Sequence, residues 1–127
     1  MRTILLGLTL ALVLFAAGLA GTYKGTFSGS SGSSGDITVS LTQSASGEWK
    51  SEVSFTLGGD TVKTKVTSLK VNDTKFTVVY TFDLQGTVLE STVAGELKDG
   101  TLAGDYHTKA LADGSAVDDG TWKATAQ

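Results

Sequence analysis

Few residues in this sequence are able to do chemistry. The 127-residue chain contains one histidine, His107, and no cysteine. A thiol nucleophile, a cysteine-rich zinc site and a histidine-rich metal site are therefore excluded. Tyr106 and His107 are consecutive residues of a predicted strand, so their side chains face opposite sides of the sheet. Because Tyr106 is expected to face inward, the His107 imidazole is expected to face solvent rather than to act as a catalytic base. No serine lies in a Gly-x-Ser-x-Gly nucleophile elbow.

The carboxylates are the remaining candidate reagents. Asp118 and Asp119, close to Asp113, resemble a cation-binding loop, but their spacing lacks the alternating oxygen ligands of an EF-hand. Aspartate is common in turns, and we interpret these three residues in that way. The glutamates fall at outward positions of predicted strands, whereas a general acid needs a buried carboxyl. We therefore predict a protein that is not an enzyme, with no catalytic residue, no metal site and no cofactor.

The N-terminal segment is typical of an export signal. Arg2 precedes an apolar run from Ile4 to Phe15, and the small residues Gly18 and Ala20 suit cleavage before Gly21. We predict a signal peptide over residues 1–20 and a single domain over residues 21–127. The location that follows is periplasmic or extracellular, with no membrane contact apart from the export signal.

The charge of the remaining 107 residues limits the partners. They contain nine lysines, no arginine and 13 acidic residues, which gives a formal charge of −4. Binding of nucleic acid needs a positive field and favours arginine, so nucleic acid is excluded as a partner. Because no disulfide is possible, stability has to come from burial of apolar side chains.

Apolar and polar residues alternate with a period of two from Gly21 onward, which predicts β-strands. We expect eight strands, separated by turns that contain Gly or Asp, at 22–27, 37–42, 48–57, 61–71, 75–82, 89–97, 102–110 and 120–124. A Gly/Ser-rich loop at 28–35 forms the longest connection. In the fourth strand the apolar positions change from even to odd numbers, which predicts a β-bulge near Thr67 and Ser68.

Short connections between consecutive strands predict an antiparallel meander. The pattern Gly-Thr-aromatic-Lys-small-Thr occurs at both ends of the domain, from Gly21 and from Gly120. If these two strands pair, the sheet closes and has no free edge. We therefore predict an all-β, eight-stranded up-and-down barrel, with a two-sheet β-sandwich as the alternative. Inward glycines at 25, 95, 104 and 120 would make room or allow sharp coiling.

Three short motifs carry a resemblance to a known group of proteins. Gly21-Thr22-Tyr23 on the first strand and Gly120-Thr121-Trp122 on the last resemble the calycin-type barrels, the group that contains lipocalins and avidins. The segment from Asp99 to Tyr106 is similar to a hairpin of avidin-like proteins. The resemblance implies a small exported barrel that binds a small hydrophobic molecule.

A stripe of inward aromatic residues is the candidate ligand-binding surface, although a small domain without disulfides favours their use as core. Its members are Trp49, Phe55, Phe76, Tyr80, Tyr106 and Trp122. Inward Ser51, Thr64 and Ser91 are possible hydrogen-bond partners for these rings or for a ligand.

Three functions fit these observations. The first is an exported binder of a small lipophilic ligand. The second is a structural or surface interaction module without a ligand. The third is a small outer-membrane β-barrel, in which the alternation is inverted and the apolar residues face lipid.

Overall fold

The computed structural model describes residues 18–127, so most of the predicted signal peptide lies outside the described residues. Within this range, nine antiparallel strands form one sheet. They are β1 (Gly21–Gly29), β2 (Ser34–Gln43), β3 (Trp49–Leu57), β4 (Asp60–Lys63), β5 (Lys65–Asn72), β6 (Lys75–Leu84), β7 (Thr87–Lys98), β8 (Thr101–Ala110) and β9 (Ala116–Ala126). None of residues 18–127 belongs to a helix long and apolar enough to cross a membrane.

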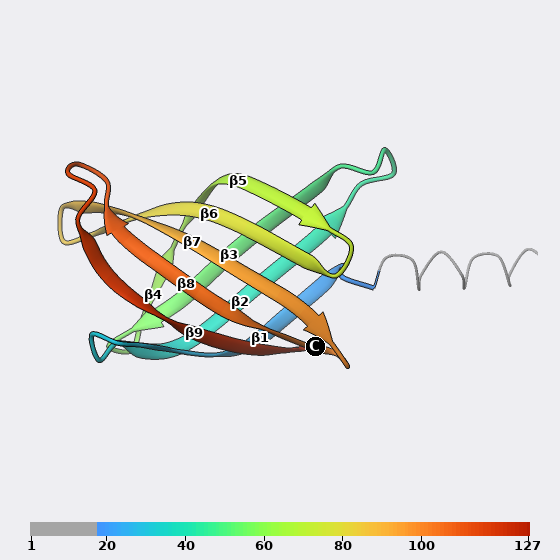
Figure 1. The fold of residues 1–127 in the computed structure, drawn as a ribbon, viewed down its shortest axis with the longest axis horizontal. Helices are drawn as coiled ribbons and strands as arrows, with labels where there is room; N and C mark the ends of the chain where they lie inside the picture. The colour runs from blue at the N-terminus through green and yellow to red at the C-terminus, as the bar shows by residue number, and fades with distance from the viewer. Residues whose placement is uncertain (1–17) are drawn as a thin grey trace, which may run out of the picture.

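The sheet is a strongly curled meander (Figure 1), with the strand order β4-β3-β2-β1-β9-β8-β7-β6-β5. The first and last strands pair in the middle of this order, and Phe27 of β1 lies opposite Trp122 of β9. The repeated pattern at the two ends of the domain predicted this pairing. The alternative of a two-sheet sandwich is wrong, because the described strands form a single sheet.

The predicted fourth strand is where the structure departs from the sequence interpretation. A break at Thr64 divides it into β4, which pairs with β3, and β5, which pairs with β6. At the break the Thr64 hydroxyl donates to the Val53 carbonyl at 2.6 Å. This side-chain hydrogen bond continues the contact with β3 beyond the last paired residue of β4. β3 and β5 contact each other without a ladder in the described chain. The eight-stranded closed barrel is therefore corrected to a nine-stranded, open half-barrel. The predicted bulge is confirmed by a register shift between Val66 and Ser68.

The inner face of the curled sheet carries the core, and the alternation follows the predicted parity. Buried apolar residues come from every strand except β4 and β5, and Val39, Leu41, Val78 and Leu102 have no exposed surface. Apart from Asp118, the charged residues of the strands face outward, as do most of the threonines. The inverted arrangement of an outer-membrane barrel, with apolar residues outside, is therefore not the one observed.

Two of the inward glycines show why the sheet is able to curl. A Cβ atom on Gly104 would collide with the backbone carbonyl of Ala94 on the neighbouring strand. A Cβ atom on Gly95 would come within 2.6 Å of the Trp122 ring and 2.7 Å of the Phe76 ring. Glycine thus allows a close approach of strands at one position and makes room for aromatic rings at the other.

The connections divide between two ends of the half-barrel. The β2–β3, β5–β6 and β7–β8 turns lie at one end together with Leu19, which is buried there, and we call this the packed end. The β1–β2, β3–β4, β6–β7 and β8–β9 turns lie at the other end (Figure 1), which we call the cavity end. The predicted loop at 28–35 is shorter than expected, because β1 extends to Gly29 and β2 begins at Ser34.

Candidate functional site

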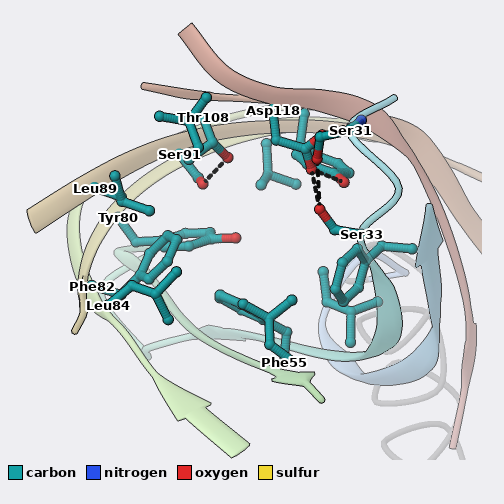
Figure 2. A pocket seen from close by; sticks show the side chains of 16 residues that line it. Ser31, Ser33, Phe55, Tyr80, Phe82, Leu84, Leu89, Ser91, Thr108 and Asp118 are labelled. Carbon is teal, nitrogen blue, oxygen red and sulfur yellow. Dashed lines mark hydrogen bonds between the residues drawn. The ribbon is translucent and has the colours of Figure 1, made fainter. Parts of the chain in front are cut away.

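A cavity of about 100 Å³ opens at the cavity end of the sheet (Figure 2). Its wall is largely aromatic and aliphatic and comes from strands that are far apart in the sequence. The aromatic members are Phe27 of β1, Phe55 of β3, Tyr80 and Phe82 of β6, and Tyr106 of β8. An apolar cavity of about 150 Å³ in another protein stays dry and binds benzene. The space here suits one small ring or a short aliphatic chain.

The aromatic side chains of the wall hold one another in place. Phe55 packs edge to face against Phe82, with ring centroids 5.0 Å apart, and against Phe27, with centroids 5.8 Å apart. Phe27 makes a second edge-to-face contact with Tyr106 at 5.9 Å. Such contacts stabilise particular ring orientations. The wall is therefore preformed rather than assembled by a ligand.

Three hydroxyl groups lie on the β6–β7–β8 side of the cavity. The hydroxyls of Ser91 and Thr108 hydrogen-bond to each other at 2.6 Å and are buried. Tyr80, only 4% exposed, points its hydroxyl into the cavity (Figure 2). Burial raises the pKa of Tyr80 to about 12, an effect that the Ser91 hydroxyl partly offsets. At neutral pH Tyr80 is therefore a neutral hydrogen-bonding group for a ligand.

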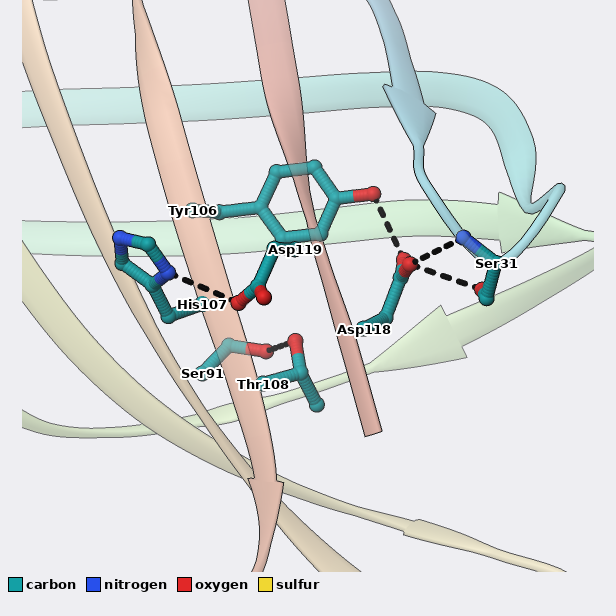
Figure 3. Close-up of polar contacts among 7 residues, drawn as sticks. All are labelled: Ser31, Ser91, Tyr106, His107, Thr108, Asp118 and Asp119. Atoms are coloured by element: carbon teal, nitrogen blue, oxygen red, sulfur yellow. Dashed lines mark hydrogen bonds and ion pairs between the residues drawn. The ribbon is translucent and has the colours of Figure 1, made fainter. Parts of the chain in front are cut away.

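Asp118 is the charged residue of the cavity wall, and it ties β9 to the β1–β2 turn (Figure 3). One carboxylate oxygen accepts hydrogen bonds from the Ser31 amide at 3.1 Å and the Ser31 hydroxyl at 2.7 Å. The other accepts from the Tyr106 hydroxyl at 2.8 Å and the Ser33 hydroxyl at 3.1 Å. The Gly/Ser-rich turn is thereby fixed against the cavity wall.

These hydrogen bonds set the ionisation of the Asp118 group. Burial acts to raise the pKa of Asp118, but the hydrogen bonds from Ser31, Tyr106 and Ser33 outweigh it and lower the pKa. The pKa of Tyr106 is raised, first by burial and then by its hydrogen bond to Asp118. Asp118 is therefore an anion at neutral pH, and Tyr106 is neutral.

Asp118 was missed by the sequence interpretation, which placed it in a turn. It lies within β9, opposite Thr108, and the register of β8 and β9 shifts between Thr108 and Lys109. A signal was present, because Asp118 shares its even-numbered parity with inward Gly120 and Trp122. That parity predicts an inward carboxylate at the end of the strand.

The structure divides the six predicted ligand-binding residues between the two ends. Phe55, Tyr80 and Tyr106 line the cavity. Trp122 and Phe76 pack against each other outside it, with ring centroids 5.9 Å apart, and the Trp122 indole donates to the Ala94 carbonyl at 3.0 Å. Trp49 is partly buried against the core at the start of β3.

The remaining polar candidates lie away from the cavity. His107 and Asp119 form an exposed pair on the outer face of the sheet, with Nδ1 and Oδ1 2.8 Å apart (Figure 3). Asp113 accepts hydrogen bonds from the amide and hydroxyl of Ser115 in its own turn. Among residues 18–127 no group of three histidine or acidic side chains is placed to hold a metal ion.

Four large apolar side chains remain exposed in the described part of the chain, and all of them lie in or beside turns of the cavity end. They are Leu84, Val88, Leu111 and Val117. They come from the β6–β7 and β8–β9 hairpins, and Leu84 and Val117 also line the cavity. Leu84 and Val117 are therefore exposed apolar side chains at the opening of the cavity, a feature that is typical of a binding site.

Comparison with known proteins shows the fold of this chain. No protein-family model matches the sequence, and no curated protein matches it. A solved structure of EF1p2_mFAP2b bound to DFHBI superposes with a TM-score of 0.64 at 15% sequence identity, covering 88% of this chain and 97% of that one. The likeness confirms the coarser part of the calycin resemblance, a curled antiparallel sheet. At this identity it is evidence of fold alone.

Proposed function

We propose that this protein is an exported, non-enzymatic binder of a small apolar ligand, which it holds in the cavity at the open end of the half-barrel. The observation that carries the proposal is a preformed aromatic cavity with the Tyr80 hydroxyl directed into it. Apolar pockets with one or two convergent polar groups are the usual form of a small-molecule site.

Three further observations support the proposal. Leu84 and Val117, which are exposed and also line the cavity, give an apolar ligand a favourable path into it. The structural neighbour with the same curled sheet is bound to the small molecule DFHBI. The predicted export signal over residues 1–20 supports a periplasmic or extracellular location.

The test is calorimetric titration of the purified protein with benzyl alcohol, a neutral ligand of one ring and one hydroxyl. We expect saturable 1:1 binding with a Kd in the millimolar range or tighter. Bound ligand should also raise the unfolding temperature, because it binds only the folded state. A titration without saturation, together with an unchanged unfolding temperature, would contradict the proposal.

A matched pair of tyrosine variants places the ligand within the sheet. Tyr80→Phe removes the hydroxyl in the cavity and should weaken benzyl alcohol binding about fivefold, the equivalent of about 1 kcal/mol for one hydrogen bond. Tyr23→Phe removes a hydroxyl from the packed end, outside the cavity wall; in the uncleaved chain this hydroxyl donates to the Leu19 carbonyl at 2.8 Å. This control should bind as the wild type does, and equal losses in both variants would argue against the cavity.

A further inference from the structure

The charge of Asp118 has no cationic partner in the described part of the chain. Its four hydrogen-bond donors are a backbone amide and the neutral hydroxyls of Ser31, Ser33 and Tyr106. The ion pairs found in residues 18–127 join Lys109 to Glu90 and His107 to Asp119. The four donors fix the carboxylate in place without neutralising it, so a negative charge remains at the cavity wall.

A second, independent feature is the aromatic surface that faces the same space. Tyr80 is 96% buried, since only 4% of its surface is exposed, and its hydroxyl is aimed into the cavity (Figure 2). Phe55 and Phe82 complete this part of the wall. Aromatic faces attract organic cations, and more strongly where water is excluded. A hydroxyl oxygen also accepts a hydrogen bond from an ammonium group.

The surroundings of the mouth have the same sign of charge. Asp113 lies in the β8–β9 turn, and Asp60 and Asp83 are strand residues close to the β3–β4 and β6–β7 turns. Lys109, which is equally close to the β8–β9 turn, is paired with Glu90 at 3.5 Å. Acidic groups around an apolar opening concentrate cations there and repel anions. Each contribution, from the wall, the aromatic faces and the rim, favours a positive ligand.

We propose that the cavity selects organic cations: a small aromatic or aliphatic body that enters the apolar space and carries an ammonium group toward Asp118. This inference rests on the proposed function and narrows the class of ligand. The ammonium supplies the counter-ion that Asp118 lacks, and a carboxylate of the same size is repelled.

The experiment compares three ligands that share one benzyl or phenyl ring and differ in charge. Benzylammonium, benzyl alcohol and benzoate are titrated into protein expressed from the full-length sequence, at pH 7 and low ionic strength. We expect affinity to fall in that order, with benzylammonium binding at least about tenfold more tightly than benzoate. The preference should narrow as salt is added, because the mouth is open to solvent.

Two adjacent variants assign the preference to one carboxylate. Asp118→Asn should reduce the ratio of benzylammonium to benzoate affinity about tenfold. Asp119→Asn changes the net charge equally on the outer face and should leave that ratio within about twofold of the wild type. Equal effects of the two substitutions would overturn the role of Asp118.

The wild-type titrations decide the inference even if Asp118→Asn fails to fold. Binding of benzyl alcohol without any order by charge, or tighter binding of benzoate, overturns the cation preference and leaves the proposed function standing. Failure of all three ligands to bind overturns both.

Discussion

The packed end and the cavity end of the sheet contain the same kinds of side chain with different hydrogen-bond partners. At the packed end the polar atoms of Trp122 and Tyr23 donate to backbone carbonyls, those of Ala94 and Leu19. At the cavity end Tyr106 donates to the carboxylate of Asp118, and Tyr80 directs its hydroxyl into the cavity.

This difference shows how one alternating pattern produces both a core and a cavity. A ring whose polar atom bonds to the nearby backbone is held against the sheet and fills the interior. Asp118 instead bonds to Ser31 and Ser33 in a separate turn, so its contacts hold that turn at the edge of the space. The cavity end is thus supported by side-chain contacts around an opening.

The largest expected effect is on stability, and it separates core from cavity wall. Trp122→Ala should lower the free energy of unfolding by about 3–5 kcal/mol, because it leaves a sealed void beside Phe76. Phe82→Ala should lower the free energy of unfolding by a smaller amount, with a difference between the two variants of at least about 1 kcal/mol. The reason is that the space left by Phe82 joins an opening that water can enter. Urea unfolding followed by circular dichroism measures both. Equal losses of unfolding free energy in the two variants would mean that the two ends are packed alike. If Trp122→Ala does not fold, Trp122→Phe takes its place in the comparison.

Acid should weaken the cavity end through Asp118. The pKa of this carboxyl is lowered in the folded protein, so its contribution to stability is present above the unfolded-state pKa near 4 and is lost as pH falls through the folded value. Unfolding measured between about pH 6 and 2 should therefore show a shallower acid loss for Asp118→Asn than for the wild type. Asp119→Asn is the control of equal charge, and an identical acid profile for the Asp118 and Asp119 variants would contradict this role.

The smallest effect concerns the exposed pair on the outer face. The pKa of His107 is raised above 6.5, chiefly by its hydrogen bond to Asp119. Its contribution to stability is therefore present below the unfolded-state pKa and is lost as pH rises through the higher folded value. An NMR titration should give a pKa above 6.5 for His107, and Asp119→Asn should bring it back down. An unshifted His107 would show that the pair does not form in solution.

The sequence predicted the inner face of the sheet almost completely. Phe55, Tyr80, Tyr106 and Trp122 all lie inward as their parity required, and the bulge beside Ser68 is where the change in parity placed it. The break at Thr64 left no such signal, because Val62, Thr64 and Val66 keep the same parity across it. The break arises because β4 pairs with β3 at one edge of the sheet and β5 pairs with β6 at the other. The local alternation of apolar residues does not specify which strand a segment pairs with.

The sequence by itself determined an all-β meander and an apolar interior, because both follow from a period of two and from short turns. The pairing of the first and last strands was indicated separately, by the pattern that Gly21 and Gly120 begin. Only the tertiary structure decided which aromatic rings fill the interior and which line a space. That outcome depends on where side chains from distant segments meet, as Asp118 of β9 meets Ser31 of the β1–β2 turn, 87 residues earlier. No local sequence pattern determines whether two such segments lie close together in the folded protein.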